Sequence, residues 1–160
     1  MYEKTLIIIK PDGVQRRLCG TILQRFESAG LKIHATRFEW TNAERSRAHY
    51  AEHVDKAFYP SLEKYITLGP MLVMVLGGVG AIAKVRQMVG KTSPAQAAPG
   101  TIRGDLAHQA MDRDDPAGSF LANLVHASAN AAEAETEISL WFSRAEVIDY
   151  EMIDDTFNGI

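Results

Sequence analysis

The sequence predicts a single α/β domain, in which short β-strands alternate with helices. Its 160 residues suit one domain with a sizeable hydrophobic core. Residues 5–9 and 71–76 are continuous runs rich in aliphatic and β-branched side chains, which are typical of buried strands. Residues 20–29 instead carry apolar side chains at helical spacing and are followed by a glycine, which favours a helix end.

Each predicted element has a local signal at one of its ends. Pro11-Asp12-Gly13 is a turn signal after the first strand, and Gly30 ends the first helix. Thr41 and Glu44 form a capping box, which predicts that a helix begins there. Asn130 is expected to cap the last helix. The expected strands are 5–9, 31–40, 71–76 and 118–124, and the expected helices are 20–29, 41–53, 61–67, 79–89 and 130–142.

This order of elements is compatible with two topologies. A strand near residues 118–124 completes the order β-α-β-β-α-β, which is the ferredoxin-like arrangement. A small doubly wound parallel sheet has a similar alternation of strands and helices. Periodicity in the sequence does not separate the two topologies.

Composition narrows the classes of function. The net charge is −3, so the chain lacks the basic footprint that general binding of nucleic acid requires, and nucleic acid is not indicated as a partner. Its single cysteine allows no intrachain disulfide, which fits a reducing compartment. The uncharged stretch at residues 68–83 contains a proline and four glycines and falls short of a membrane span. Without a signal-peptide pattern at residues 1–10, the expected location is cytoplasmic.

Two patterns suggest other functions and are weakened by their context. Residues 78–83 fit the glycine-rich fingerprint G-x-G-x-x-A of dinucleotide-binding enzymes. However, the acidic residue expected about 20 positions later is absent, and the remaining chain is too short for the usual sheet. His49 and His53 are spaced to bind a metal from one helix, but no third ligand is suggested. A P-loop is excluded, because the sequence has no G-x-x-x-x-G-K-[ST].

A third set of residues points to phosphate chemistry. Lys10 ends the first strand, Arg86 lies on a predicted helix, and Arg103 follows a loop rich in proline and glycine. His126 is followed only by small side chains, so its imidazole is sterically open, and neutral histidine is a competent nucleophile. Glu137 on the last helix is a candidate to orient that imidazole. These features alone leave open whether His126 is catalytic or an ordinary histidine.

Taken together, the motifs resemble the nucleoside diphosphate kinase family, over about residues 4–150. A set of spaced motifs in order is more specific than any one of them. The resemblance implies a ferredoxin-like domain over residues 1–160, with a four-stranded antiparallel sheet covered by helices. The matching segments are residues 5–14 (Thr-Leu-Ile-Ile-Ile-Lys-Pro-Asp-Gly-Val), His49-Tyr50, Phe58-Tyr59-Pro60, Gly69-Pro70-Met71, residues 86–94, residues 99–105, residues 123–128 and Trp141-Phe142.

The family's reaction moves the γ-phosphoryl group of a nucleoside triphosphate to a nucleoside diphosphate in two steps, and so equilibrates nucleotide pools. The resemblance implies that His126 is the phosphorylated nucleophile, that Glu137 orients it, and that Ser128 bonds to Glu137. The partners are therefore nucleoside di- and triphosphates. The implied cofactor is Mg²⁺, held chiefly by the nucleotide phosphates and water rather than by protein ligands.

The resemblance also assigns roles in binding the base and ribose. Phe58 is expected to stack on the base, with Leu62 lining the same cleft. Stacking tolerates every base, because each base has a π-face. Lys10 and Asn123 are expected to bind ribose hydroxyls, and Lys10 also reaches the phosphates.

The phosphates are expected to be held by Arg86, Thr92 and Arg103, with Tyr50 supporting the site. Phosphoryl transfer asks a protein mainly for positioning and for positive charge around the phosphoryl oxygens, and these residues supply both. A non-enzymatic scaffold protein of the same fold would not need them together. The resemblance further implies a homo-oligomer: a dimer, tetramer or hexamer.

Two features depart from the common family pattern. Ala127 and Ala129 replace the glycine and the acidic residue that usually flank the serine after the nucleophile. Ala127 requires that the backbone there does not need a positive φ. Residues 107–120 are longer than the usual connection, and an extended loop is expected there, near the cleft or at a subunit interface.

Overall fold

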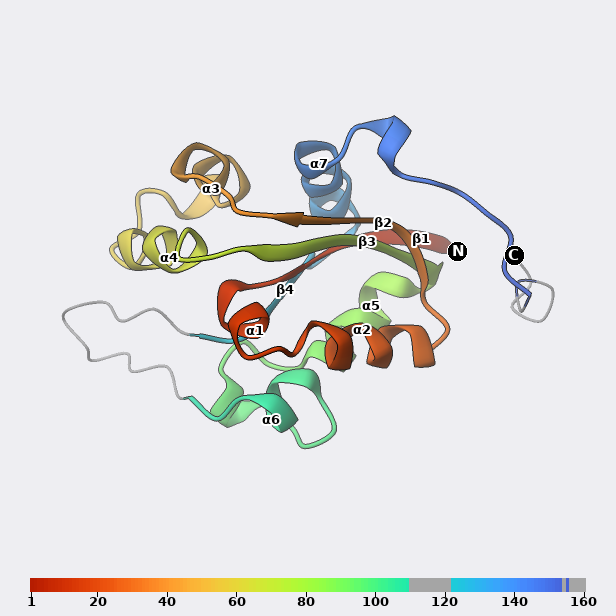
Figure 1. Cartoon of the computed structure of the whole chain (residues 1–160), viewed down its shortest axis with the longest axis horizontal. Helices are drawn as coiled ribbons and strands as arrows, with labels where there is room; N and C mark the ends of the chain where they lie inside the picture. Colours follow the sequence, from red (N-terminus) through yellow and green to blue (C-terminus); the bar gives the residue numbers. More distant parts are fainter. Residues whose placement is uncertain (110–121, 154, 156–160) are drawn as a thin grey trace.

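A four-stranded antiparallel sheet in the order β2-β3-β1-β4 forms the frame of the protein (Figure 1). The computed structural model describes residues 1–109, 122–153 and 155. The long strands β1 and β3 pair at the centre, and the short β4 pairs with β1 at one edge. The strands are β1 (Tyr2–Ile9), β2 (Lys32–Glu39), β3 (Met71–Val79) and β4 (Val125–Ala127).

Helices cover both faces of the sheet. In the view of Figure 1, α2, α5 and α6 lie below the sheet, whereas α3 and α7 lie above it. The helices are α1 (Pro11–Gln15), α2 (Cys19–Ser28), α3 (Ala43–His49), α4 (Tyr59–Ile66), α5 (Ala81–Val89), α6 (Ile102–Leu106) and α7 (Ala131–Trp141), with short 3₁₀ turns η1 (Ala51–His53), η2 (Pro94–Gln96) and η3 (Arg144–Glu146).

The central strand β1 separates two hydrophobic cores. Successive side chains of a strand point to opposite faces, so Ile7 and Ile9 enter one core and Leu6 and Ile8 the other. The first core is completed by α2 and α5, and the second by α4 and the end of α7. Because both faces are covered, residues 5–9 are all buried, which explains why β1 is a continuous apolar run.

The antiparallel sheet confirms the ferredoxin-like fold and excludes the doubly wound alternative. The sheet topology also gives the glycines of the fingerprint at residues 78–83 a structural role that requires no bound dinucleotide. Gly78 lies inside β3, opposite Glu3 of β1, and Gly80 precedes α5 with a left-handed φ of 62°. The glycines therefore serve the connection from β3 to α5.

The predicted boundaries around α1 and α3 were wrong. Pro11-Asp12-Gly13 begins the short helix α1, because proline is well accommodated in the first turn of a helix. Asn42, not Thr41, caps α3 by accepting from the backbone N–H of Arg45, and Thr41 is buried. α3 ends at His49, and the predicted continuation to residue 53 is the separate turn η1.

The last strand lies later than predicted. β4 covers residues 125–127 instead of 118–124, so His126 lies in the strand and not beyond it. Residues 122–124 are outside any strand, and residues 118–121 lie outside the described residues. The predicted extended loop at 107–120 also lies outside the described residues beyond position 109.

No helix in the described part of the chain is long and apolar enough to cross a membrane. The cytoplasmic location stays a prediction.

Candidate active site

The register of β4 determines which way His126 points. His126 pairs with Ile8 across the antiparallel ladder, and paired residues project from the same face of a sheet. The imidazole therefore lies on the face covered by α3 and α7, while Val125 and Ala127 enter the opposite core. Lys10 is two residues beyond Ile8 in extended backbone, so it is expected on the same face as His126.

The segment before β4 has an unusual backbone conformation. Leu124 has a φ of 68°, which is uncommon for a residue with a side chain and must be held by its surroundings. Its carbonyl accepts from the backbone N–H of Lys10 at 2.8 Å, and its own N–H donates to the Asp12 carboxylate at 3.2 Å. Leu124 is fully buried. These contacts fix the chain two residues before His126.

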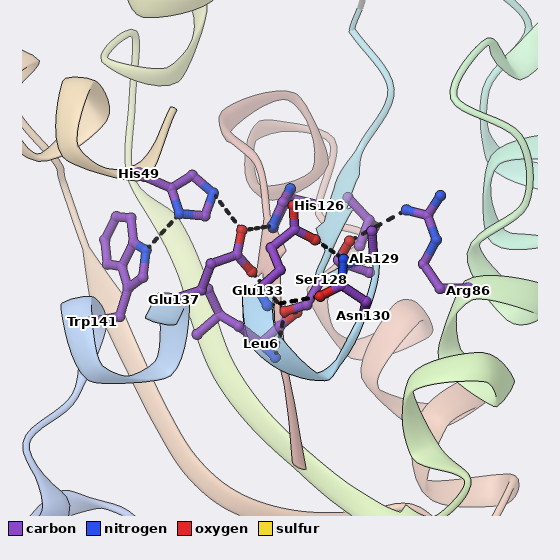
Figure 2. Close-up of polar contacts among 12 residues, drawn as sticks. Leu6, His49, Arg86, His126, Ser128, Ala129, Asn130, Glu133, Glu137 and Trp141 are labelled. Atoms are coloured by element: carbon purple, nitrogen blue, oxygen red, sulfur yellow. Dashed lines mark hydrogen bonds and ion pairs between the residues drawn. The ribbon is translucent and has the colours of Figure 1, made fainter. Parts of the chain in front are cut away.

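One nitrogen of the His126 ring is bound by a carboxylate (Figure 2). The Nε2 atom of His126 lies 2.7 Å from Oε1 of Glu137 on α7. The other carboxylate oxygen accepts a hydrogen bond of 2.6 Å from the Ser128 hydroxyl. Ser128 is in turn held by the backbone N–H of Leu6. Nδ1 of His126 has no hydrogen-bond partner among the described residues.

Electrostatics keep this ring neutral. Burial lowers the pKa of His126 to about 3, assisted by the positive charges of Lys10, Arg103 and Arg86. A neutral imidazole carries one proton, and Glu137 as an acceptor places that proton on Nε2. Nδ1 then bears a lone pair, and 18% of the side chain remains exposed. The arrangement presents a neutral nitrogen nucleophile at the surface of the site.

Three cationic side chains surround the histidine. Lys10 is 6% exposed and donates to Oδ1 of Asn123 at 2.7 Å. Burial and the neighbouring Arg103 lower the pKa of Lys10 to about 7. Arg86 on α5 donates to the backbone carbonyl of Ala127, next to His126. An electropositive site of this kind attracts phosphate groups.

Arg103 has a structural role that the sequence did not suggest. Its guanidinium donates to three backbone carbonyls, those of Gly90, Asn123 and Val125. These contacts connect α6 and the end of α5 to the segment that leads into β4. Each terminal nitrogen of a guanidinium carries two N–H groups, so one on each is not used by the described residues and can bind a ligand.

A row of aromatic rings connects His126 to Phe58. The ring centroids of His126 and Tyr50 are 6.2 Å apart, those of Tyr50 and His53 are 6.4 Å apart, and those of His53 and Phe58 are 5.6 Å apart. Phe58 is 45% exposed at the start of α4. Leu62 follows one helical turn later, on the same side of the helix as Phe58. The buried hydroxyl of Tyr50 has no partner among the described residues.

Thr92 lies in the loop that follows α5. Its backbone carbonyl accepts from the Asn123 side chain at 3.0 Å, while its own side chain is exposed. Asn123 thus joins Lys10 to the loop that follows α5. In this way the structure brings the predicted residues around His126 into one continuous set of contacts.

Sequence reasoning missed three residues of this site. Asp12 was interpreted only as a turn residue, yet its carboxylate accepts from Tyr65 and from the backbone of Leu124. His49 was considered only with His53, whereas its ring lies 4.5 Å from that of His126. Trp141 donates from its indole N–H to His49 at 3.2 Å. The sequence signal that could have found them is that all three fall in segments that resemble the family motifs.

One group of side chains has the right ligand types to hold a metal. It consists of a ring nitrogen of His49, a ring nitrogen of His126 and a carboxylate oxygen of Glu137, which all lie within 4.8 Å of one another. Indole N–H is only a donor, so the bond from Trp141 uses the lone pair of His49 Nδ1 and leaves the proton on Nε2, toward Glu137. A metal at this place requires that bond to break. The structure therefore favours a network of hydrogen bonds over a metal centre.

Among the described residues, the site offers no ready place for a protein-held magnesium ion. Mg²⁺ prefers oxygen ligands. The carboxylates of Asp12, Glu133 and Glu137 already accept hydrogen bonds from protein groups. This donor set fits a metal that arrives with nucleotide phosphates.

A groove of about 500 Å³ lies away from His126, along the outer side of α7 and the first residues of β1. None of the predicted site residues lines it.

Comparison with known proteins gives one consistent family. The family model described as nucleoside diphosphate kinase matches residues 3–147. The chain is 47% identical to the nucleoside diphosphate kinase of Pyrococcus abyssi over 155 residues, which cover 97% of this chain and 93% of that protein. It is 46% identical to that of Archaeoglobus fulgidus over 153 residues, 96% of this chain and 95% of that protein.

Solved structures agree with the sequence comparisons. A transition-state mimic of the nucleoside diphosphate kinase from Borrelia burgdorferi, with bound vanadate and ADP, superposes with a TM-score of 0.93 at 37% identity. The match covers 99% of this chain and 97% of that one. The halophilic enzyme from Halobacterium salinarum, in complex with CDP, has a TM-score of 0.87 at 40% identity, and 98% of each chain is covered.

Proposed function

The chain belongs to the nucleoside diphosphate kinase family, and we propose that Nδ1 of His126 carries the phosphoryl group in its reaction. The protein is a phosphotransferase that moves the γ-phosphoryl group of a nucleoside triphosphate to a nucleoside diphosphate. The observation that supports His126 is its hydrogen bond to Glu137. That bond occupies Nε2 and leaves a partly exposed, neutral Nδ1 beside three cations.

In the first step, the lone pair of Nδ1 attacks the γ-phosphorus and forms a P–N bond. The bond from the γ-phosphorus to the bridging oxygen breaks, and the nucleoside diphosphate leaves with that electron pair. The ring keeps its proton on Nε2, and the positive charge that develops on it is stabilised by the Glu137 carboxylate. A second nucleoside diphosphate then attacks the phosphohistidine, which reverses the step and gives ping-pong kinetics.

The charge of the transferred group is balanced by the cations of the site. Lys10, Arg86 and Arg103 contact the same short segment that carries His126, and we assign them, with Thr92, to the phosphates. Members of the family use a divalent metal. Here we propose Mg²⁺, which reaches the site on the nucleotide phosphates and neutralises part of their charge.

The exposed ring of Phe58 is assigned to stack on the base, and Leu62 to line the same side. The CDP and ADP complexes of the related enzymes support a nucleotide in this cleft. Lys10 and Asn123, which are hydrogen-bonded to each other, are assigned to the ribose hydroxyls. Tyr50 is assigned to support the site, since its hydroxyl is buried there and has no partner in the described part of the chain.

A homo-oligomer is proposed as the working form. β2 is an edge strand, and Phe38 and Trp40 at its end are 62% and 66% exposed. Edge strands and exposed aromatic residues are common at subunit contacts. Light scattering on the purified protein tests this: a mass of 17.7 kDa at micromolar concentration would contradict it.

Phosphoenzyme formation tests the proposed function. The protein is mixed with γ-labelled ATP and Mg²⁺ without an acceptor, alongside His126→Gln, and with His108→Gln as a matched control at an exposed position. We expect acid-labile, base-stable label that is absent only from His126→Gln and transfers to added GDP. Phosphorus NMR of the labelled protein should place the phosphoryl group on Nδ1. A folded, ATP-binding wild-type protein without label would favour the non-enzymatic scaffold instead.

A further inference from the structure

His49 lies beside the pair formed by His126 and Glu137, with its ring turned toward the Glu137 carboxylate (Figure 2). Its side chain is 1% exposed, and its ring packs edge-on against those of His126 and Tyr50, with centroids 4.5 Å away in each case. It is therefore too deeply buried to touch a nucleotide. A side chain buried at this place can affect the reaction only through the residues that it contacts.

The tautomer of His49 follows from its hydrogen bond to Trp141. The indole Nε1–H can only donate, so Nδ1 of His49 accepts that bond. Burial, assisted by His126, lowers the pKa of His49 to about 3, so the ring is neutral and has one proton. That proton must be on Nε2, which lies 3.6 Å from Oε1 of Glu137 and has no other partner among the described residues.

Glu137 needs help to remain ionised. Burial raises its pKa, and the hydrogen bond from the Ser128 hydroxyl lowers it. Three donors thus face its two oxygens: His126 and His49 face Oε1, and Ser128 faces Oε2. A separation of 3.6 Å exceeds a hydrogen bond, yet an N–H dipole at that distance still stabilises a carboxylate in a buried site.

We propose that His49 is a positioning residue of the phosphotransfer reaction. Its Nε2–H, fixed in direction by Trp141, keeps Glu137 an anion and so keeps Nε2 of His126 protonated and Nδ1 free to react. This inference rests on the proposed function of His126. It adds two residues, His49 and Trp141, to the groups that determine which nitrogen of His126 is reactive.

Other charged groups around the pair must be considered, since they also affect how Glu137 and His126 titrate. Those on the surrounding elements are Lys10 after β1, Tyr50 after α3, Arg86 on α5, Arg103 on α6 and Glu133 on α7. None of them is altered by a substitution at position 49. A change in pH dependence in such a variant is therefore due to the group removed from His49.

Two substitutions separate the donor of His49 from its acceptor. In His49→Gln, the amide nitrogen occupies about the place of Nε2, so a donor toward Glu137 remains, while the acceptor for Trp141 is lost. In His49→Asn, the amide oxygen occupies about the place of Nδ1, so the acceptor remains, while the donor at the place of Nε2 is lost. If His49 served only packing and stability, His49→Asn would be the milder change, since it keeps an acceptor for the buried indole N–H of Trp141.

The rate of phosphoenzyme formation is measured for both variants across the range from about pH 5 to about pH 9, with melting temperatures alongside. We expect His49→Asn to react about tenfold more slowly than wild type and its acid limb to move to higher pH, because Glu137 is then protonated more easily. His49→Gln should stay within roughly threefold of wild type and keep the acid limb in place, although it melts at a lower temperature. The Michaelis constant for the nucleotide should be unchanged in both.

Equal rates in the two variants, rates that follow the melting temperatures, or an acid limb that does not move in His49→Asn would overturn the proposal. Failure of the proposed function has a different signature, since the wild-type protein itself would then take up no label on His126. The two ideas can therefore fail separately.

Discussion

Glu137→Gln offers the sharpest test of the pair formed by His126 and Glu137. Glutamine has nearly the same shape as glutamate, and its oxygen can still accept from Nε2 of His126, which lies 2.7 Å from the carboxylate. Its amide group can then donate to the Ser128 hydroxyl, which already accepts from the backbone of Leu6. The substitution thus removes the negative charge while it keeps the packing and the hydrogen bonds.

The expected loss comes from the change of a charge-assisted hydrogen bond into a neutral one. That difference is about 1–1.5 kcal/mol, and it appears mainly in the transition state, where positive charge develops on the ring. Phosphoenzyme formation should therefore slow by about tenfold. Because the shape is kept, the free energy of unfolding should change by less than about 1 kcal/mol.

Rapid-quench measurement of a single turnover, at mildly alkaline pH, gives the rate directly. The matched control is Glu135→Gln, which makes the same change of charge at an exposed position of the same helix. An equal loss of rate in Glu135→Gln would mean that the overall negative charge of α7, and not the hydrogen bond between Glu137 and His126, is responsible. A Glu137→Gln protein with an unchanged rate would refute the role of the carboxylate charge.

Three further outcomes are expected. Ser128→Ala should lower the free energy of unfolding by about 1–3 kcal/mol in urea denaturation, because buried Glu137 loses the donor at 2.6 Å; unchanged stability would contradict this. Since the pKa of Lys10 is lowered to about 7, this side chain is largely uncharged above that pH in the free enzyme, and bound phosphate favours its charged form. Nucleotide binding at about pH 8 should therefore take up a proton, and the affinity for the nucleotide should fall as pH rises. Calorimetry in buffers of different ionisation enthalpy should show this proton uptake in the wild-type protein and its loss in Lys10→Met. Gly90→Ala should destabilise by about 1–3 kcal/mol, because φ is +85° and a Cβ would lie 2.6 Å from a threonine hydroxyl. Gly20→Ala, where a Cβ meets nothing within 4 Å, should instead be neutral or stabilise the protein by up to about 1 kcal/mol in thermal unfolding.

The sequence was most informative where the signal was local. The apolar run of β1 and the cap of α7 at Asn130 were both predicted, because burial and helix capping leave direct traces in neighbouring residues. Boundaries failed where two local signals compete, as at Thr41 and Asn42, which are both acceptable caps. Periodicity could not tell a parallel from an antiparallel sheet, and the family resemblance supplied that answer.

Contacts between distant parts of the chain could not be predicted from the sequence. Asp12 accepts from Tyr65, which is 53 positions away, and from Leu124, which is 112 positions away. Nothing near Asp12 in the chain indicates either partner, and its residue type equally suits a turn. The same holds for His49 and Trp141, 92 positions apart, whose bond determines a tautomer that no local pattern encodes.

The position of His126 within a strand explains how a flexible side chain can offer the single reactive nitrogen that the proposed mechanism requires. In a loop, the ring could turn either nitrogen toward the substrate. In β4, the pairing with Ile8 fixes the backbone, and the left-handed Leu124 is held by contacts from β1 and α1. Glu137 then approaches from α7 and binds Nε2. The sheet sets the place of the ring and the helix sets its orientation, so that only Nδ1 is left to meet the phosphate.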